Sequence, residues 1–324
     1  MADYKSIKGT KIQNYTTDPD NPLTGQVWYN ETDQVLKYDA PLVGAWATGN
    51  DLNTARFYLA GAGTQTAGLA IGGSDPLQIP AYVAVTESYN GTSWTEVNDL
   101  NTARGILAGC GSDNTAALVF GGLLIPPTTI YAQTESWNGT SWTEVNDLNT
   151  ARYGSAGAGT QTAALAIGGA GPADVESWDG TSWTAVNNLN TPRGLSGAAG
   201  ADNTADLAIG GGPPSVALVE SWNGTSWTEV NDLNTARREL AGAGIQTSAL
   251  AFGGFIPDRT GATESWNGTS WTEVNDLNTA RRQLAGAGIQ TAALAFGGEN
   301  AGSATLAATE EWSISGGTKT ITSS

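Results

Sequence analysis

A string close to Asn-Asp-Leu-Asn-Thr-Ala-Arg occurs six times in this chain of 324 residues, at intervals of 41 to 48 residues. After each copy comes an apolar segment that ends in two glycines, and then a segment close to Glu-Ser-Trp-Asn-Gly-Thr-Ser-Trp. Self-similarity with a period of about 20 to 50 residues is typical of folds in which each unit buries its apolar face against its neighbours. This repeat constrains the fold more than any other feature of the chain.

Each unit predicts four short strands. The first follows the recurrent Arg through a segment such as Glu-Leu-Ala-Gly-Ala-Gly, and the second ends in the diglycine. The third and fourth flank Asn-Gly, a strong hairpin signal because both residues tolerate positive φ. With a four-residue loop, Trp137 and Trp142 would form a cross-strand pair that packs against the next unit. The diglycines lie at Gly72-Gly73, Gly121-Gly122, Gly168-Gly169, Gly211-Gly212, Gly253-Gly254 and Gly297-Gly298.

The order of these landmarks resembles the kelch family. Its pattern is an Arg, a strand that ends in Gly-Gly, an aromatic residue, and a Trp about six residues further on. The fifth unit shows it as Arg237, Leu250–Gly254, Trp266 and Trp271. The resemblance covers residues 45–314 and departs in the third strand, where Glu-Ser-Trp replaces a Tyr-containing strand. It implies an all-β, six-bladed β-propeller and says nothing about chemistry.

We expect the propeller to occupy residues 45–324 and an extension to occupy residues 1–44. Residues 45–49 precede the first copy of the string just as a fourth strand precedes every other copy, and no second Trp follows Trp312. We therefore predict that residues 45–49 complete the last blade. The β-prone segment 318–322 is the alternative closing strand.

The extension contains the pattern of a β-hairpin, Val27–Tyr29 and Val35–Tyr38 around a polar turn. This Gly-x-x-Trp-Tyr-Asn and Leu-Lys-x-Tyr pattern resembles a module of tail-fibre and other virion proteins of bacteriophages, especially marine ones. The resemblance implies a virion protein made in the host cytoplasm, and the N-terminus lacks the apolar stretch of a secretory signal. A hairpin that only caps the ring is the alternative.

Composition excludes several function classes. The net charge of −17 disfavours nucleic acid and anionic lipid as partners, and no run of 18 apolar residues predicts membrane insertion. The chain has no His, the commonest general base and metal ligand. Its single cysteine, Cys110, has no partner for a disulfide and is expected to be a buried thiol. We expect no enzymatic activity, no cofactor and no metal.

Sialidases are also six-bladed, and their Asp-box lies where Ser-Trp-Asp-Gly-Thr-Ser-Trp lies in this chain. The version here is one residue shorter. Arg193, Arg237 and Arg281 could take the parts of the arginine triad of a sialidase. An Arg recurs at that place in all six units, however, so a scaffold role explains it more economically.

One Arg and one Glu recur in every unit, which predicts a repeated, partly buried ion pair with bidentate geometry. A ring of Arg that binds an anion at the channel mouth is the alternative. The pairs join Arg56, Arg104, Arg152, Arg193, Arg237 and Arg281 to Glu87, Glu135, Glu176, Glu220, Glu264 and Glu310. A recurrent Asp could ring a cation such as Ca²⁺, although Asn-Asp before a turn more often caps its own backbone. These positions are Asp51, Asp99, Asp147, Asp232 and Asp276.

The segment after each diglycine differs in every unit, and its length ranges from 6 to 13 residues. In an up-and-down meander these segments share one face with the recurrent string. Varied loops on a repeated scaffold are where binding specificity normally lies, and drift in tolerant loops is the alternative. The predicted partner-binding residues are Leu123, Leu124, Ile125, Tyr131, Phe255 and Ile256.

Two function classes follow. The first is a virion structural or adhesin module that contacts other virion proteins, or a glycan or protein of the host surface. Assembly into a homo-oligomer is a further possibility. The second is a free multivalent lectin that uses the repeated Trp and Asn side chains as equivalent sugar pockets. Equal pockets between blades would favour the lectin, and one asymmetric loop face would favour the adhesin.

Overall fold

The structure, a computed structural model, describes residues 12–77, 81–126, 128–170 and 174–321, which form two compact units. The larger one, here called the ring unit, is Trp46–Ser313. The smaller one, here called the terminal unit, comprises the described residues of Met1–Ala45 and Ile314–Ser324. The predicted division into 1–44 and 45–324 therefore differs at the C-terminus, because the residues after Ser313 group with the N-terminal segment.

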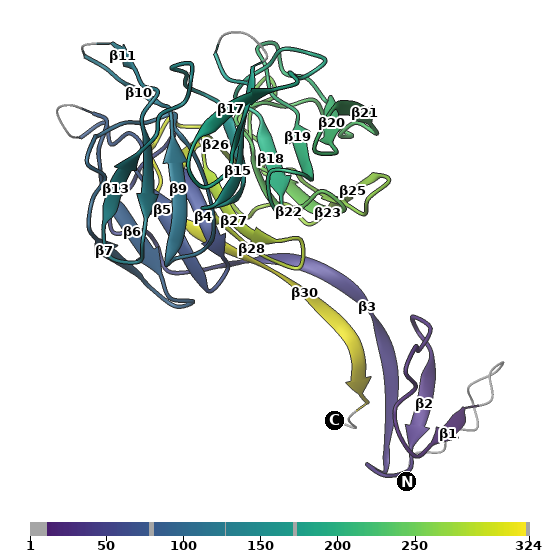
Figure 1. Ribbon diagram of the computed structural model, residues 1–324. Coiled ribbons are helices and arrows are strands. Elements are labelled where there is room, and N and C mark those ends of the chain that lie inside the picture. The colour runs from purple at the N-terminus through teal and green to yellow at the C-terminus, as the bar shows by residue number, and fades with distance from the viewer. Residues whose placement is uncertain (1–11, 78–80, 127, 171–173, 322–324) are drawn as a thin grey trace. The chain divides into compact units, whose positions relative to one another are not determined.

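Every repeat of the ring unit contributes strands in up-and-down order (Figure 1). The first strands are β4 (Ala60–Thr64), β8 (Ala108–Asp113), β14 (Ala156–Thr160), β18 (Gly197–Gly200), β22 (Ala241–Ile245) and β27 (Ala285–Ile289). The second strands are β5 (Ala67–Ile71), β9 (Ala116–Phe120), β15 (Ala163–Ile167), β19 (Asp206–Ile209), β23 (Ser248–Phe252) and β28 (Ala292–Phe296). Their Leu, Ile, Val and Phe side chains are fully buried and pack in clusters with residues of neighbouring sheets.

The outer strands complete these sheets. The third strands are β6 (Thr86–Tyr89), β12 (Thr134–Trp137), β16 (Val175–Trp178), β20 (Val219–Trp222), β24 (Thr263–Trp266) and β30 (Thr309–Thr320). The fourth strands are β7 (Trp94–Val97), β13 (Trp142–Val145), β17 (Trp183–Val186), β21 (Trp227–Val230) and β25 (Trp271–Val274). Two small pairs also occur, β10 (Leu123–Leu124) with β11 (Thr129–Ile130), and β26 (Arg281–Arg282) with β29 (Glu299–Asn300). Among the described residues, no helix is both long and apolar enough to cross a bilayer.

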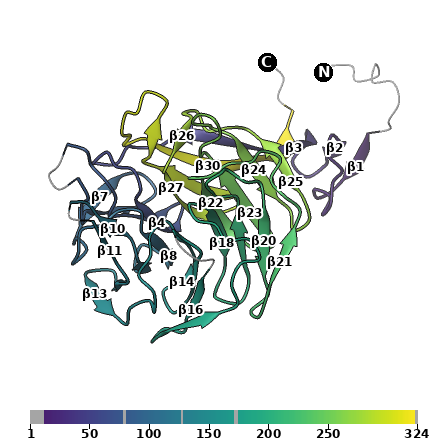
Figure 2. The ribbon, with the colours of Figure 1, turned by 90° about the horizontal axis from the view of Figure 1, so that it is seen from above.

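The first strands surround one axis (Figure 2). Each contacts the first strand of the next repeat, and β27 contacts β4, which closes the circle. Their alternating Gly and Ala residues allow this approach: a Cβ on Gly61 would lie only 2.4 Å from the carbonyl oxygen of Gly286.

The six expected blades are not six equal sheets. Five sheets have four strands each, whereas the last sheet has six strands in the order β1-β2-β3-β30-β28-β27. The expectation of six separate four-stranded blades is therefore wrong, and five are found. The reason is the length of β3 (Val35–Thr48), which pairs with β30 on one side and with β2 (Val27–Asn30) on the other. β2 in turn pairs with β1 (Gln13–Tyr15).

The part of β3 around Trp46 nevertheless makes the contacts of a fourth strand. Trp46 packs against Trp312 with ring centroids 5.4 Å apart, and its Nε1 donates to Thr263 of the preceding repeat at 3.1 Å. Asn278 Nδ2 donates to the carbonyl oxygen of Trp46 at 3.2 Å, as Asn234 does to that of Trp271. The alternative closing strand, 318–322, lies in the terminal unit as far as it is described.

The hairpins between the third and fourth strands have four-residue loops. Trp137 lies opposite Trp142, and their ring centroids are 5.2 Å apart. We expected both residues of the Asn-Gly pair to adopt positive φ. Only the glycine does so, with a φ of 87° at Gly139. Asn138 contributes through its side chain instead, because Oδ1 accepts the backbone N–H groups of Thr140 and Ser141 at 2.9 Å.

The recurrent Arg and Glu form an ion pair in every repeat. In the first repeat, Arg56 Nη2 lies 2.9 Å from Glu87 Oε1, and both side chains are fully buried. Arg56 also donates to the carbonyl oxygens of Gly72 and Val85, while Glu87 accepts the backbone N–H groups of Asn53 and Thr54. The pair thus joins the recurrent string to the second and third strands of its own sheet. The other pairs are Arg104–Glu135, Arg152–Glu176, Arg193–Glu220, Arg237–Glu264 and Arg281–Glu310.

The diglycine joins each repeat to the next one. The backbone N–H of Gly73 donates to the carbonyl oxygen of Arg104 at 3.0 Å, and Gly298 of the last repeat donates to Arg56 of the first at 2.9 Å. Gly72 has a φ of 59°, and a Cβ there would lie 2.7 Å from that Arg104 oxygen. In the fourth repeat, which has three glycines, Gly210-Gly211 rather than Gly211-Gly212 makes these contacts. The predicted position of the diglycine was wrong by one residue, because the sequence does not indicate which two of the three adjacent glycines make these contacts.

In the terminal unit, Asp18 connects the Pro- and Asp-rich segment to the hairpin. Its carboxylate accepts hydrogen bonds from Trp28 Nε1 at 3.0 Å, Asn30 Nδ2 at 2.8 Å and Lys37 Nζ at 2.8 Å. These bonds, that of Lys37 first, lower the pKa of Asp18 to about 2. Trp28 is fully buried.

Removal of one carboxylate should show how much the repeated ion pair contributes. Glu87→Gln leaves Arg56 charged and buried without a counter-ion, and we expect the free energy of unfolding to fall by about 3 to 5 kcal/mol in urea denaturation. The control is Glu96→Gln, because Glu96 lies opposite Glu87 on β7 but is exposed; a change within about 0.5 kcal/mol is expected. Equal effects of the two variants would contradict a dominant role of the ion pair.

Candidate functional site

The turn between the recurrent Arg and the first strand forms the mouth of the central channel. The second residue after each Arg has positive φ, and its N–H donates to the carbonyl oxygen of its counterpart in the preceding repeat at 2.7 to 2.9 Å. Six such bonds form a closed circle. Its members are Tyr58, Ile106, Gly154, Leu195, Glu239 and Gln283. We expected the first strands to begin at the Arg; they begin four residues later because of this turn.

The varied loops lie beside this mouth. The residue directly after the Arg bridges to the residue after the diglycine, as in Phe57 with Ser74, Gly105 with Leu123, and Arg238 with Phe255. The recurrent turn and the varied loop therefore share one face, here called the loop face.

The mouth contains a pocket of about 120 Å³. Below the six turn residues, its wall consists of the third residue after each Arg. In four repeats this residue is a buried Leu, and in the other two it is Ser155 or Ser196. The pocket is therefore apolar on one side and hydroxylated on the other, although the surrounding scaffold is nearly symmetric.

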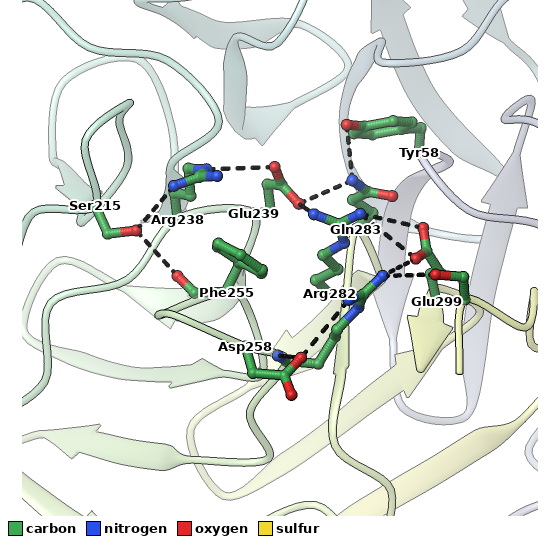
Figure 3. Close-up of polar contacts among 11 residues, drawn as sticks. Tyr58, Ser215, Arg238, Glu239, Phe255, Asp258, Arg282, Gln283 and Glu299 are labelled. Atoms are coloured by element: carbon green, nitrogen blue, oxygen red, sulfur yellow. Dashed lines mark hydrogen bonds and ion pairs between the residues drawn. The ribbon is translucent and has the colours of Figure 1, made fainter. Parts of the chain in front are cut away.

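A cluster of charged and amide side chains forms the rim over the fifth and sixth repeats (Figure 3). Glu239 lies 3.4 Å from Arg238 through Oε1, and 3.3 Å from Arg282 through Oε2. Gln283 Nε2 donates to Glu239 Oε2 at 2.8 Å and to the hydroxyl oxygen of Tyr58 at 2.7 Å. Burial, followed by the charge of Glu239, raises the pKa of Tyr58, so the phenol stays protonated at neutral pH.

The loop of the fifth repeat extends the cluster. The Phe255 ring lies 4.5 Å from the Arg238 guanidinium and 5.1 Å from that of Arg282, distances at which cation–π attraction operates. Arg259 and Arg282 both pair with Glu299. Burial alone would raise the pKa of Glu299, but the hydrogen bond from Arg259 and the charge of Arg282 lower it below its usual value. The three arginines of this rim are thus matched by carboxylates.

The predicted loop residues do not lie together in this cluster. Leu123 is only 4% exposed and belongs to the core, whereas Ile125 is 41% exposed. Leu124, Tyr131 and Ile256 are half-buried, and so is Phe255, which packs against the rim arginines. We expected Leu123 to be partly exposed, but its side chain is buried. Its backbone pairs with that of Gly105, which holds this residue against the ring.

The recurrent Arg and Glu residues, and four of the five recurrent Asp residues, are engaged within the scaffold. The Arg guanidiniums bind Glu and backbone carbonyl oxygens rather than pointing into the channel. Asp99 accepts the backbone N–H of Thr86 at 3.2 Å, and Asp276 accepts that of Thr263 at 3.1 Å. Within the described ranges, no group of three or more Cys, Asp or Glu could hold a metal ion.

The rim residues were missed although the sequence carries a signal for them. The two positions after the recurrent Arg are Phe-Tyr, Gly-Ile, Tyr-Gly, Gly-Leu, Arg-Glu and Arg-Gln in the six units. They vary, whereas the residue before them is always Arg and the residue after them is Leu in four units and Ser in two. Such local variation in a repeat marks a place where the scaffold does not dictate the side chain.

The solved structure of YjhT resembles this chain, with a TM-score of 0.67 over 82% of this chain and 99% of that one. This chain is a β-propeller. The two sequences are 12% identical, so the likeness concerns the fold alone. No protein-family model and no curated protein matches the sequence.

Two buried titratable groups of the propeller lie away from the mouth. Cys110 is 6% exposed, and burial raises the pKa of its thiol. Asp206 is fully buried, and neither carboxyl oxygen has a partner among the described residues. Burial, followed by the charge of Asp202, raises the pKa of Asp206 well above its usual value. The other five repeats have Gly or Ala at this position, so the carboxyl group is not required by the scaffold.

We expect Asp206→Ala to stabilise the propeller at neutral pH and to lose this advantage near pH 4. In the wild type, the unfolded chain loses its Asp206 proton from about pH 4 upward while the folded chain keeps it. Stability therefore falls by about 1.4 kcal/mol per pH unit until the raised pKa is reached. Urea denaturation from pH 4 to pH 7 measures this trend. Asp206→Asn, which keeps the shape, should also abolish the pH dependence; a stability gain that is equal at both pH values would show that packing, not charge, is responsible.

Proposed function

We propose that this chain is a non-catalytic binding propeller that contacts its partner through the loop face. The observation that carries the proposal is the rim cluster of Tyr58, Arg238, Glu239, Arg282 and Gln283. These side chains occupy positions where the other repeats have unrelated residues, and the fold does not need them. A single asymmetric polar rim on a regular ring is the arrangement expected of a protein that recognises one partner.

The second function class, a multivalent lectin with equal pockets, has less support. It would use the repeated Trp residues, and the 11 Trp residues of the ring unit are each 6% exposed or less. The Asn side chains of the hairpin loops accept hydrogen bonds from their own turns. The Trp rings are therefore not exposed for stacking on a sugar, and the Asn Oδ1 atoms are already engaged.

We further propose that the sixth sheet serves as the sixth blade of a kelch-like ring and that the chain belongs to a bacteriophage virion, as a tail-fibre or capsid-associated protein. The closed circle of six backbone bonds at the mouth supports the sixfold arrangement. The virion assignment rests on the resemblance of the N-terminal hairpin. In this role the terminal unit attaches the chain to other virion proteins, and the loop face meets a glycan or a protein of the host surface.

Binding to intact host cells tests the role of the loop face. Leu77, Ile125 and Ile130, which are 90%, 41% and 45% exposed, lie in its varied loops. We expect their combined replacement by Ser to weaken binding of the labelled chain by about tenfold or more, since exposed apolar side chains commonly contribute to interfaces.

The matched control is Ile245→Ser with Ile289→Ser, because these residues are 41% and 54% exposed in the turns of the opposite face. It should leave binding unchanged. Loss of binding in the control alone would place the interface on the opposite face. Absence of the chain from purified virus particles, together with no binding to cells, would overturn the proposed function.

A further inference from the structure

The mouth pocket contains buried polar atoms that the protein leaves without partners. Ser155 Oγ, Ser196 Oγ and Gln283 Oε1 have no hydrogen-bond partner among the described residues. Ser155 is 9% exposed and Gln283 is 6% exposed, and all three side chains line the same pocket. Buried polar groups in proteins are nearly always hydrogen-bonded, so these atoms indicate a polar group that enters the pocket.

The rim holds one of these atoms in a defined direction. Both hydrogens of the Gln283 amide are used, one by Tyr58 and one by Glu239. Its oxygen is left without a partner among the described residues and can act as an acceptor only. Tyr58 accepts the bond from Gln283 and keeps its own hydroxyl proton for another acceptor. The pocket thus offers one fixed acceptor, one phenol donor, and two serine hydroxyls that both donate and accept.

Among the residues that the structure describes, no unmatched charge lines this pocket. Both oxygens of Glu239 are engaged by Arg238, Arg282 and Gln283. Glu299 in turn pairs with Arg259 and Arg282. An ionic ligand would have to break these pairs and leave a charge without its partner, which is costly at a partly buried site. The ligand that fits is therefore neutral.

The rest of the pocket wall is apolar. Leu59, Leu107, Leu240 and Leu284 are the lining residues of the other four repeats, and each is 6% exposed. A sugar ring has this combination of properties, with a C–H face that packs on apolar side chains and hydroxyl groups that both donate and accept. The volume of about 120 Å³ is below the roughly 150 Å³ of a cavity that holds benzene, so only part of a sugar ring would lie inside the pocket. The open mouth leaves the remaining substituents in solvent.

We propose that the mouth pocket binds one neutral sugar ring, the terminal unit of a surface glycan. Ser155, Ser196, Tyr58 and Gln283 bind its hydroxyl groups, and the leucines contact its apolar face. This inference rests on the proposed function, because a host-surface glycan is one of the partners expected there. It adds the ligand class and the residues that recognise it.

The test uses the full chain and a panel of methyl glycosides of glucose, galactose, mannose and N-acetylglucosamine, with saturation-transfer NMR and calorimetry. At least one glycoside should bind with a Kd on the order of 1 mM, as expected for a ligand of this size. Because a methyl glycoside copies the end of a glycan, it should bind at least as well as the free sugar. Clearly tighter binding of the free sugar would contradict the glycan source.

Two double variants locate the site. Ser155→Ala with Ser196→Ala removes both hydroxyls and should weaken binding by roughly 30-fold, the effect of two neutral hydrogen bonds. Ser155→Leu with Ser196→Leu copies the residue of the other four repeats, fills the pocket and should abolish binding while the ring stays folded. The control, Ser141→Ala with Ser182→Ala in the hairpin loops of the opposite face, should bind like the wild type.

The inference fails if no glycoside of the panel shows binding at a ligand concentration of about ten times that Kd. The pocket would then hold only water. It also fails if a glycoside binds equally well to the wild type and to the leucine variant. These outcomes are separate from failure of the proposed function. Sugar binding that depends on Ser155 and Ser196, without any binding to cells or presence in virus particles, would overturn the virion role and leave the pocket assignment intact.

Discussion

The buried Arg–Glu pair is the interaction on which the rest of this structure depends. Within one repeat it connects the recurrent string to the second and third strands, and Glu87 binds the backbone of that string. The carbonyl oxygen of the same Arg accepts the N–H of the preceding repeat's diglycine. One residue therefore joins strands within a sheet and sheets around the ring. A buried ion pair is more stable when its remaining donors and acceptors are also bonded, and here backbone carbonyl and N–H groups bind part of them, as at Arg56 and Glu87.

A scaffold held in this way leaves a few positions free. The turn after the Arg is fixed by its backbone, through positive φ and the closed circle of hydrogen bonds, so its side chains can differ from repeat to repeat. Glu239 and Gln283 use that freedom to build a polar rim, while Ile106 and Leu195 remain apolar at the equivalent places. The asymmetry of the mouth is therefore produced by side chains alone, on a backbone that is nearly symmetric.

Much of the fold could be predicted because the repeat contains its own explanation. The Asn-Gly hairpins, the Trp137–Trp142 pair and the pairing of Arg with Glu depend on residues that are close in sequence or recur at a constant spacing. The rim could not be predicted in the same way. Arg238 and Phe255 meet across a bridge, and Tyr58 and Gln283 come from the first and last repeats. They become neighbours only when the ring closes.

The sequence by itself determined the β architecture, the number of repeats and the face on which they differ, since strand patterning, turn residues and periodicity are local properties. Tertiary structure alone decided three further features. It extended β3 so that the last sheet has six strands, it buried Leu123 while leaving Ile125 exposed, and it brought Ser155 and Ser196 to the same pocket as Gln283. The physical reason is that burial and pocket shape depend on which residues meet across the axis. Which residues meet there cannot be read from their order along the chain.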